Sequence, residues 1–220
     1  QVAVMTHTRR GDEIILGEKS HIYVNEVAGV AYLAGVQTAL ITEIDGVMDP
    51  RQVEGKIRSE NIHFPKTSLI CVENTHNMAG GRVVPLEVME KIHGVGKGHG
   101  IPVHLDGARI YNAATYLGVE AKEIARHCDS VNVCLSKGLC APVGSVLAGS
   151  NEFIERARKF RKMLGGGMRQ AVILAAAGIV AVEKMTKRLK IDHDNALLLA
   201  KGLNSLEGVT VDLDKVQTNL

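Results

Sequence analysis

Short apolar runs alternate with stretches of helical periodicity over the first two thirds of the chain. The strongest runs cover residues 67–72, 101–105 and 130–135, and helix-like segments separate them. Strands that alternate with helices usually pair in parallel through right-handed crossovers. The pattern therefore predicts an α/β fold with a mostly parallel central sheet flanked by helices.

Weaker signals complete this predicted domain. The sequence opens on the end of a helix, and further strands and helices are expected in segments of suitable pattern. The expected strands are 13–16, 37–44 and 143–148, and the expected helices are 22–33, 85–93, 119–128 and one that begins at Asp49-Pro50. Glycines at 94, 96, 98 and 100 predict that the helix 85–93 stops there and is followed by a turn.

The last third changes to helix, expected at 151–164, 168–189 and 192–206, with a short strand at 209–211. We expect a large domain over residues 1–188 and the beginning of a small C-terminal α/β domain over 189–220. Both ends of the sequence have the character of a longer protein, and we expect an N-terminal part of the large domain to be missing.

Composition excludes some classes of partner. The formal net charge is only +2 and aromatic residues make up 3% of the chain, so we expect neither nucleic acid nor an acidic membrane surface as a partner. The apolar run 171–182 is too short to span a bilayer and is expected to be a buried core helix. The four cysteines contain no Cys-x-x-Cys pair, and they predict reduced core residues in a cytoplasmic protein, with the mitochondrial matrix as the alternative.

Reactive side chains follow three of the predicted strands. His76 comes after the first strand, Asp106 and Arg109 after the second, and Ser136 and Lys137 after the third. Ligands of open α/β sheets gather beyond the carboxyl ends of the strands. The sequence therefore predicts a site at this edge of the sheet.

Each of these residues has a structural alternative. Lys137 lies between apolar strands, so we expect it to be desolvated and able to attack an aldehyde, whereas a solvated turn lysine is the alternative. Asp106 can pair with a protonated ring nitrogen or simply cap a helix. Arg109 can hold a carboxylate in its guanidinium fork or form a surface ion pair.

Two histidines and a glycine-rich segment are further candidates. His21 and His76 can be structural, or they can stack on a cofactor and move protons. His104 and Asp106 share one strand face and could hold a metal together with His76, but no further ligand completes such a set and we expect no metal. The segment 165–169 precedes a helix and could bind an anion, and the basic run 156–162 could also reach a phosphate.

Four of these segments together resemble a known family. Residues 73–77, 103–109, 134–138 and 163–170 are similar in order and spacing to the low-specificity L-threonine aldolases. These are lyases that depend on pyridoxal phosphate, have the aminotransferase-like fold type I and fall within the beta-eliminating lyase family. Members also carry an N-terminal phosphate loop and a C-terminal domain with a further arginine, which this sequence lacks.

The resemblance implies a cofactor site for pyridoxal 5′-phosphate. Lys137 would carry the cofactor, Asp106 would pair with its pyridine nitrogen and His21 would stack on its ring. Ser136 and Arg169 would bind the phosphate, with Arg169 contributed by the same or a neighbouring subunit.

The resemblance also implies a reaction and a partner. His76 would lie near the substrate hydroxyl as a candidate base, and Arg109 would bind the substrate carboxylate. The substrate would be a small amino acid, L-threonine or L-allo-threonine, cleaved between Cα and Cβ to glycine and acetaldehyde. A homo-oligomer, a tetramer built from dimers, is implied as well.

Three alternatives remain open from the sequence. Another fold-type-I enzyme, either a β-eliminating lyase or a serine hydroxymethyltransferase, would use the same aspartate and lysine. A non-catalytic protein would keep the scaffold without turnover. A metal hydrolase would be built on His76, His104 and Asp106.

Overall fold

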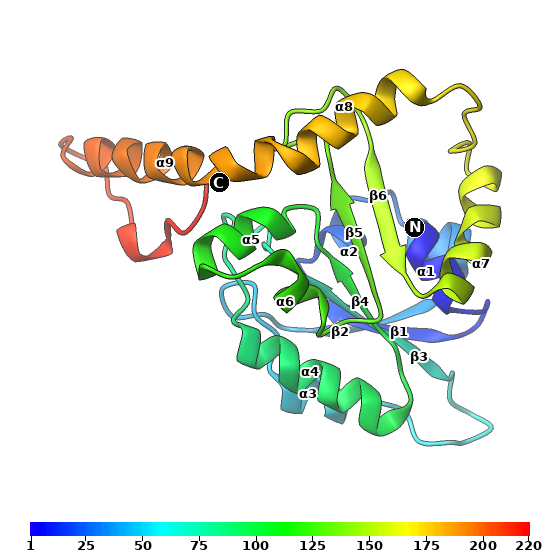
Figure 1. The fold of residues 1–220 in the computed structure, drawn as a ribbon. Coiled ribbons are helices and arrows are strands. Elements are labelled where there is room, and N and C mark those ends of the chain that lie inside the picture. Colours follow the sequence, from blue (N-terminus) through cyan, green and yellow to red (C-terminus); the bar gives the residue numbers. More distant parts are fainter.

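A six-stranded sheet forms the centre of the computed structural model, which describes residues 1–220 (Figure 1). Its strand order is β2-β1-β3-β4-β5-β6; the first five strands are parallel, and β6 runs antiparallel to β5. The strands are β1 (Glu13–Gly17), β2 (Gln37–Ile41), β3 (Thr67–Glu73), β4 (Val103–Asp106), β5 (Ser130–Cys134) and β6 (Ser145–Gly149). The predicted α/β fold with a mostly parallel sheet is confirmed.

Helices cover both faces of this sheet. The chain contains α1 (Val2–His7), α2 (His21–Val24), η1 (Val30–Ala34), α3 (Pro50–Gly55), α4 (Leu86–His99), α5 (Ile110–Leu117), α6 (Ala121–Ala125), α7 (Asn151–Met163), α8 (Val172–Glu183), η2 (Met185–Arg188), α9 (Leu189–Asn204) and η3 (Leu213–Lys215). Apolar side chains of α3 to α6 pack in one core cluster, whereas α1, α2 and η1 contribute to the core on the other face. The sheet therefore lies in the middle of a three-layer arrangement.

The central strands are apolar at nearly every position because both faces are buried. In β3, Ile70 packs in the cluster with α3 to α6, while its neighbours Leu69 and Cys71 pack in the cluster with α1 and α2. Side chains alternate between the two faces of a strand, so when both faces are covered every side chain is buried. This explains the continuous apolar runs in the sequence.

The chain beyond the sheet forms an extended arm. Helices α8 and α9 run one after the other away from the sheet, and the terminal segment folds back toward it (Figure 1). The Thr218 hydroxyl donates to the Gly81 carbonyl at 3.0 Å, and Gln217 accepts a hydrogen bond from the Val83 amide at 2.8 Å. The expected strand at 209–211 does not form, since no neighbouring strand of this chain is there to pair with it.

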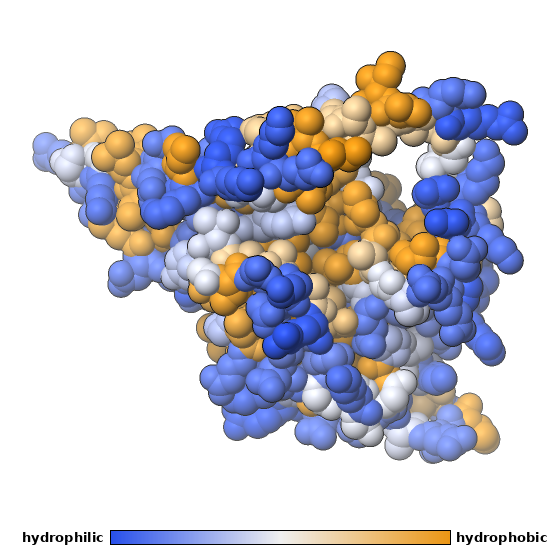
Figure 2. Space-filling view, viewed as in Figure 1, coloured by the Kyte–Doolittle hydropathy of each residue, from blue (hydrophilic) through white to orange (hydrophobic).

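Helix α8 is exposed where the sequence predicted a buried core helix. Only Gly178 and Ala181 are buried, and Ala181 packs against the small cluster around Leu139 and Leu189. No element of this chain covers the remaining sides of α8, which form an apolar surface visible at the top of Figure 2. None of the helices combines the length and apolar character needed to cross a membrane.

The predictions for the helix 22–33 and for the cysteines also need correction. The expected helix 22–33 is split into α2 and η1, because Val27 and Ala28 have positive φ angles of 52° and 53°. All four cysteines are unbridged, but Cys140 is exposed and so is not a core residue.

Helix α4 continues through the glycines that were expected to stop it. It ends only at Gly100, which has a left-handed φ of 66° and serves as its C-cap. A Cβ atom at Gly96 would lie 2.6 Å from the Ile101 carbonyl oxygen and 2.9 Å from Val103 Cγ2. Glycine is therefore needed at this position for close packing of α4 on the start of β4, and not to end the helix.

Gly96→Ala should destabilise the protein by about 1–3 kcal/mol, since the added methyl group meets backbone that cannot move aside easily. Gly94→Ala is the matched control, because nothing lies within 4 Å of its added Cβ. It should stabilise the protein by roughly 0.5–1 kcal/mol through helix propensity. Urea denaturation of both variants measures the free energies of unfolding, and equal effects would contradict the packing role of Gly96.

Candidate active site

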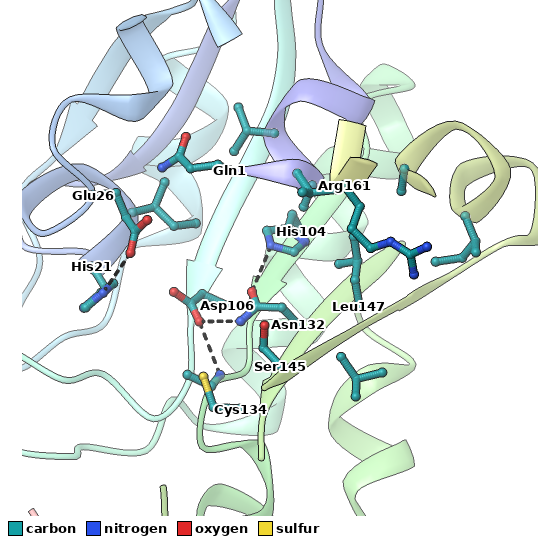
Figure 3. A pocket seen from close by; sticks show the side chains of 18 of the residues that line it. Gln1, His21, Glu26, His104, Asp106, Asn132, Cys134, Ser145, Leu147 and Arg161 are labelled. Carbon is teal, nitrogen blue, oxygen red and sulfur yellow. Dashed lines mark hydrogen bonds and ion pairs between the residues drawn. The ribbon is translucent and has the colours of Figure 1, made fainter. Parts of the chain in front are cut away.

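The carboxyl ends of β3, β4 and β5 come together beside a cavity. Parallel pairing sets Glu73 level with Asp106, and Asp106 level with Asn132. The cavity has a volume of about 650 Å³ and is walled by α1, α2, β4, β5, β6 and α7. Its polar lining includes His21, Glu26, Asp106, Asn132, Lys137 and Arg161; Figure 3 shows all of these except Lys137 with labels.

Asp106 presents one held and one free carboxylate oxygen. Its Oδ1 accepts hydrogen bonds from the Ala108 amide and from Asn132 Nδ2, both at 3.2 Å, while Oδ2 accepts none within the chain. Asp106 does not cap α5, whose N-cap residue is Arg109. A buried carboxylate that keeps one unpaired oxygen at a cavity wall is suited to accept an N–H group of a ligand.

Lys137 lines the same cavity from the loop between β5 and β6. The expectation that it is desolvated is wrong for this chain, because Lys137 and Ser136 are both exposed. The flanking strands are apolar, but the loop lies beyond their ends, and its contacts with α8 and α9 are made by Leu139 and Ala141 and not by Lys137. Ser136 does not line the cavity.

His21 begins α2 and faces the cavity with a defined ring orientation. Asn25 Nδ2 donates to Nδ1 at 3.3 Å, so the ring hydrogen lies on Nε2, which donates to Glu26 Oε1 at 3.1 Å. Sequence reasoning identified His21 but missed Glu26. Glu26 lies five residues after His21, in a segment that the sequence predicts as one helix. The sequence gave no distinct signal that the two side chains interact.

Glu73 connects two loops of the site. Its buried carboxylate accepts the His21 amide hydrogen at 2.7 Å and the Asn77 amide hydrogen at 2.8 Å. Burial raises its pKa, although these hydrogen bonds and the nearby His76 act in the opposite direction. Glu73 was part of a recognised motif, yet the sequence alone gave it no role.

His76 lies outside the cavity, although the sequence suggested that it would be close to a substrate. Its side chain is 1% exposed; Nδ1 accepts the Ala79 amide hydrogen at 3.2 Å, and Nε2 lies 2.9 Å from Glu43 Oε1. Burial opposes protonation, but the contact with Glu43 and the charge of Glu73 outweigh it, so the pKa of His76 is raised. His76, His104 and Asp106 do not form a group that could hold a metal ion, which removes the basis for a metal hydrolase.

The predicted arginines are also outside the cavity lining. Arg109 is half-buried and donates to Asn77 Oδ1 at 3.1 Å, and burial lowers its pKa. Arg169 is exposed in the connection between α7 and α8. Arg158 and Arg161 of α7 line the cavity instead, as the basic run in the sequence allowed. Of the predicted site residues, the structure thus brings together three: His21, Asp106 and Lys137.

A family comparison shows to which family the chain belongs. The profile described as beta-eliminating lyase matches residues 1–220. The chain belongs to the beta-eliminating lyase family. Among its curated relatives, low-specificity L-threonine aldolase 1 of Arabidopsis thaliana is 46% identical over the whole chain, and the low specificity L-threonine aldolase of Escherichia coli K12 is 43% identical over the whole chain.

This beta-eliminating lyase family member spans 62% and 64% of the length of those two relatives. Solved structures resemble it in fold. A putative L-allo-threonine aldolase from Listeria monocytogenes has a TM-score of 0.83 at 24% identity, covering 99% of this chain and 59% of that one. The threonine aldolase of Leishmania major has a TM-score of 0.79 at 21% identity, covering 92% and 60%.

The raised pKa of His76 predicts a loss of stability in alkaline solution. A histidine whose folded pKa exceeds its unfolded value stabilises the fold below about pH 6.5 and loses that contribution as the pH rises through the folded pKa. The free energy of unfolding should therefore fall as the pH rises from about 6.5 through the raised pKa of His76. His76→Gln should remove this part of the slope, as measured by urea denaturation across the range.

His63→Gln is the control for this measurement, because His63 is exposed and takes part in no ion pair. It should leave the slope unchanged. Buried His7 and His104 do not interfere, since burial lowers the pKa of each to about 4 and both are neutral throughout this window. Identical slopes for the unsubstituted protein and His76→Gln would show that the pKa of His76 is not raised.

Proposed function

We propose that the protein is a pyridoxal-phosphate-dependent lyase that cleaves L-threonine and L-allo-threonine to glycine and acetaldehyde. The observation that carries this proposal is the position of Asp106, His21 and Lys137 on one cavity, with Oδ2 of Asp106 unpaired. The relatives' names, which specify threonine aldolases, support the choice of substrate.

The residues at the cavity fit pyridoxal phosphate. Asp106 Oδ2 can accept the N–H of a protonated pyridine ring, and the Lys137 amine can bind an aldehyde covalently. The imidazole of His21 is a flat surface for a ring, and its contacts with Glu26 and Asn25 keep it from turning. The cavity thus offers a carboxylate for the ring nitrogen, an amine for the aldehyde and an aromatic ring for stacking.

Two groups of residues are candidates for binding the phosphate. Arg158 and Arg161 line the cavity in this chain, and a guanidinium fork suits phosphate oxygens. The motif that resembles the aldolases implicates Ser136 and Arg169. We propose that Arg169 reaches the site of a second copy of the chain, since it is exposed and distant from the cavity of its own.

The substrate carboxylate is assigned to Arg109. It follows β4 by three residues and is oriented by Asn77, which Glu73 holds in turn. To bind the substrate, the guanidinium would exchange its contact with Asn77 for the carboxylate. Neighbouring Glu73 and Asp106 hold Arg109 in its charged form against the effect of burial.

The reaction requires a base for the β-hydroxyl proton. When bound, pyridoxal phosphate supplies a conjugated ring that accepts the electron pair released as the Cα–Cβ bond breaks. His21 and His104 both line the cavity; His104 is buried within β4, and His21, at the start of α2, is the candidate base. His76, which lies outside the cavity with Nε2 3.9 Å from Glu73 Oε2, is the alternative. Removal of the hydroxyl proton releases acetaldehyde, and return of a proton to Cα gives glycine.

We propose that copies of the chain assemble into a homo-oligomer, a tetramer of paired dimers. Helix α8 has no polar face, and Val172, Ile173, Ile179 and Val180 are between 46% and 86% exposed. Apolar surface of this extent on a soluble domain usually marks an interface. We further propose a cytoplasmic location, in keeping with four unbridged cysteines.

Lys137→Ala should abolish both cofactor attachment and threonine cleavage. Borohydride reduction of the protein mixed with pyridoxal phosphate, followed by peptide mapping, should place the cofactor on Lys137 in the unsubstituted protein and nowhere in the variant. Lys97→Ala, in the exposed part of α4, is the control and should behave as the unsubstituted protein. Glycine and acetaldehyde formed from threonine separate an aldolase from a β-eliminating lyase or a non-catalytic protein.

Arg161→Gln should weaken binding of pyridoxal phosphate about tenfold, which corresponds to roughly 1.4 kcal/mol. Its binding of pyridoxal, which lacks the phosphate, should not change. Lys159→Gln on the same helix is the matched control, because Lys159 is exposed and does not line the cavity. Equal losses for both ligands in absorbance titrations would contradict a phosphate contact.

A further inference from the structure

A chain of hydrogen bonds runs along one face of β4 and β5 to Asp106. His104 and Asp106 alternate on β4, Ser130 and Asn132 alternate on β5, and parallel pairing sets each pair level. Ser130 Oγ lies 2.7 Å from His7 Nε2 and 2.8 Å from His104 Nδ1. His104 Nε2 lies 3.2 Å from Asn132 Oδ1, and Asn132 Nδ2 lies 3.2 Å from Asp106 Oδ1 (Figure 3).

The chemistry of the five side chains allows only one direction for these bonds. An ionised Asp106 accepts only, so Asn132 must present its amide N–H₂ to it and its oxygen to His104. His104 Nε2 must then carry the hydrogen, and in a neutral ring Nδ1 is an acceptor. Ser130 therefore donates to His104 Nδ1, and its oxygen accepts the hydrogen of His7 Nε2.

Both histidines are neutral at physiological pH, as this direction requires. Burial lowers the pKa of His104 and of His7 to about 4. The His7 ring is also held from the other side, stacked on Phe153 of α7 at a centroid distance of 4.4 Å. No buried polar atom of His7, Ser130, His104, Asn132 or Asp106 is left without a partner.

We propose that His7, Ser130, His104 and Asn132 form a one-directional relay that positions the Asp106 carboxylate for the ring nitrogen of the cofactor. Every donor in the relay points toward Asp106, which keeps Oδ1 occupied and leaves Oδ2 to the cavity. These four are positioning residues, since only Asp106 meets the cofactor. The inference rests on the proposed function for the identity of that cofactor, whereas the direction of the relay is a property of the protein itself.

The first test reads the relay in the cofactor-free protein. Proton–nitrogen NMR of the labelled, unsubstituted protein distinguishes imidazole tautomers. At neutral pH, His104 and His7 should both be uncharged with the hydrogen on Nε2. A charged ring, or a hydrogen on Nδ1 of His104, would overturn the proposed direction.

The second test compares two buried serines in the same sheet. Ser130→Ala interrupts the relay, whereas Ser68→Ala removes a buried hydroxyl of β3 whose nearest acceptor is the Glu13 carbonyl at 3.5 Å. Ser130→Ala should weaken binding of pyridoxal phosphate about tenfold, because His104 and Asn132 lose the donor that fixes their orientation toward Asp106. Ser68→Ala should leave it unchanged.

An analogue of pyridoxal phosphate with C–H in place of the ring nitrogen makes the second test specific. This analogue cannot donate to Asp106, so Ser130→Ala should bind it as tightly as the unsubstituted protein does. An equal loss for both ligands would show a general structural defect and overturn the relay, and so would no loss for either.

Substitutions of His104 provide a rescue. His104→Gln retains one amide donor and one acceptor and should keep binding of pyridoxal phosphate within about threefold of the unsubstituted protein, while His104→Leu should lose at least as much as Ser130→Ala. Equal behaviour of the two would contradict the relay. If pyridoxal phosphate does not attach to Lys137 of the unsubstituted protein, the proposed function fails, and the tautomers still decide the direction of the relay.

Discussion

The parallel pairing of β3, β4 and β5 is the interaction on which the site depends. Each strand ends at the same edge of the sheet, and the register sets Glu73, Asp106 and Asn132 side by side. A slip of one residue between β4 and β5 would turn Asn132 to the other face and leave Asp106 Oδ1 without its side-chain donor. The buried apolar positions on both faces of the sheet oppose such a slip, so the core that stabilises the fold also sets the geometry of the cavity.

The buried carboxylates of this core are each bound by neighbouring donors or cations. Glu13 receives hydrogen bonds from Arg58 and Gln37 far from the cavity and has a purely structural position. Glu43, Glu73 and His76 form a second buried group beside the loop after β3. Burying charge is unfavourable unless it is compensated, and these carboxylates have either a cation or several N–H donors. The cavity thus lies between two rigid polar clusters, the relay along β4 and β5 and the group around Glu73.

The fold was largely predictable from the sequence, because continuous apolar strands separated by helices admit few arrangements. Its local errors have physical causes. The glycines of α4 suggested a turn, but Gly96 is there for contact with Ile101, a long-range effect that local pattern does not contain. The exposure of α8 and the missing strand at 209–211 both arise because no other element of this chain lies against them.

The site was predictable in part for the same reason. His21, Asp106 and Lys137 follow or precede strands directly, so topology alone brings them to one cavity. His76 and Arg109 lie outside the cavity lining because their side chains are directed by Glu43 and Asn77, and the sequence pattern does not reveal these contacts. The directions of the hydrogen bonds along β4 and β5 became readable only once the strand register was known.

The double role of Glu73 has a mechanical consequence. One carboxylate holds the amide of His21 at the start of α2 with Oε2, and the amide of Asn77 in the loop after β3 with Oε1. The Glu73 side chain therefore links the start of α2 to the loop after β3. A displacement of the His21 backbone would be transmitted through Glu73 to Asn77, and from Asn77 Oδ1 to the Arg109 guanidinium, from which it accepts a hydrogen bond.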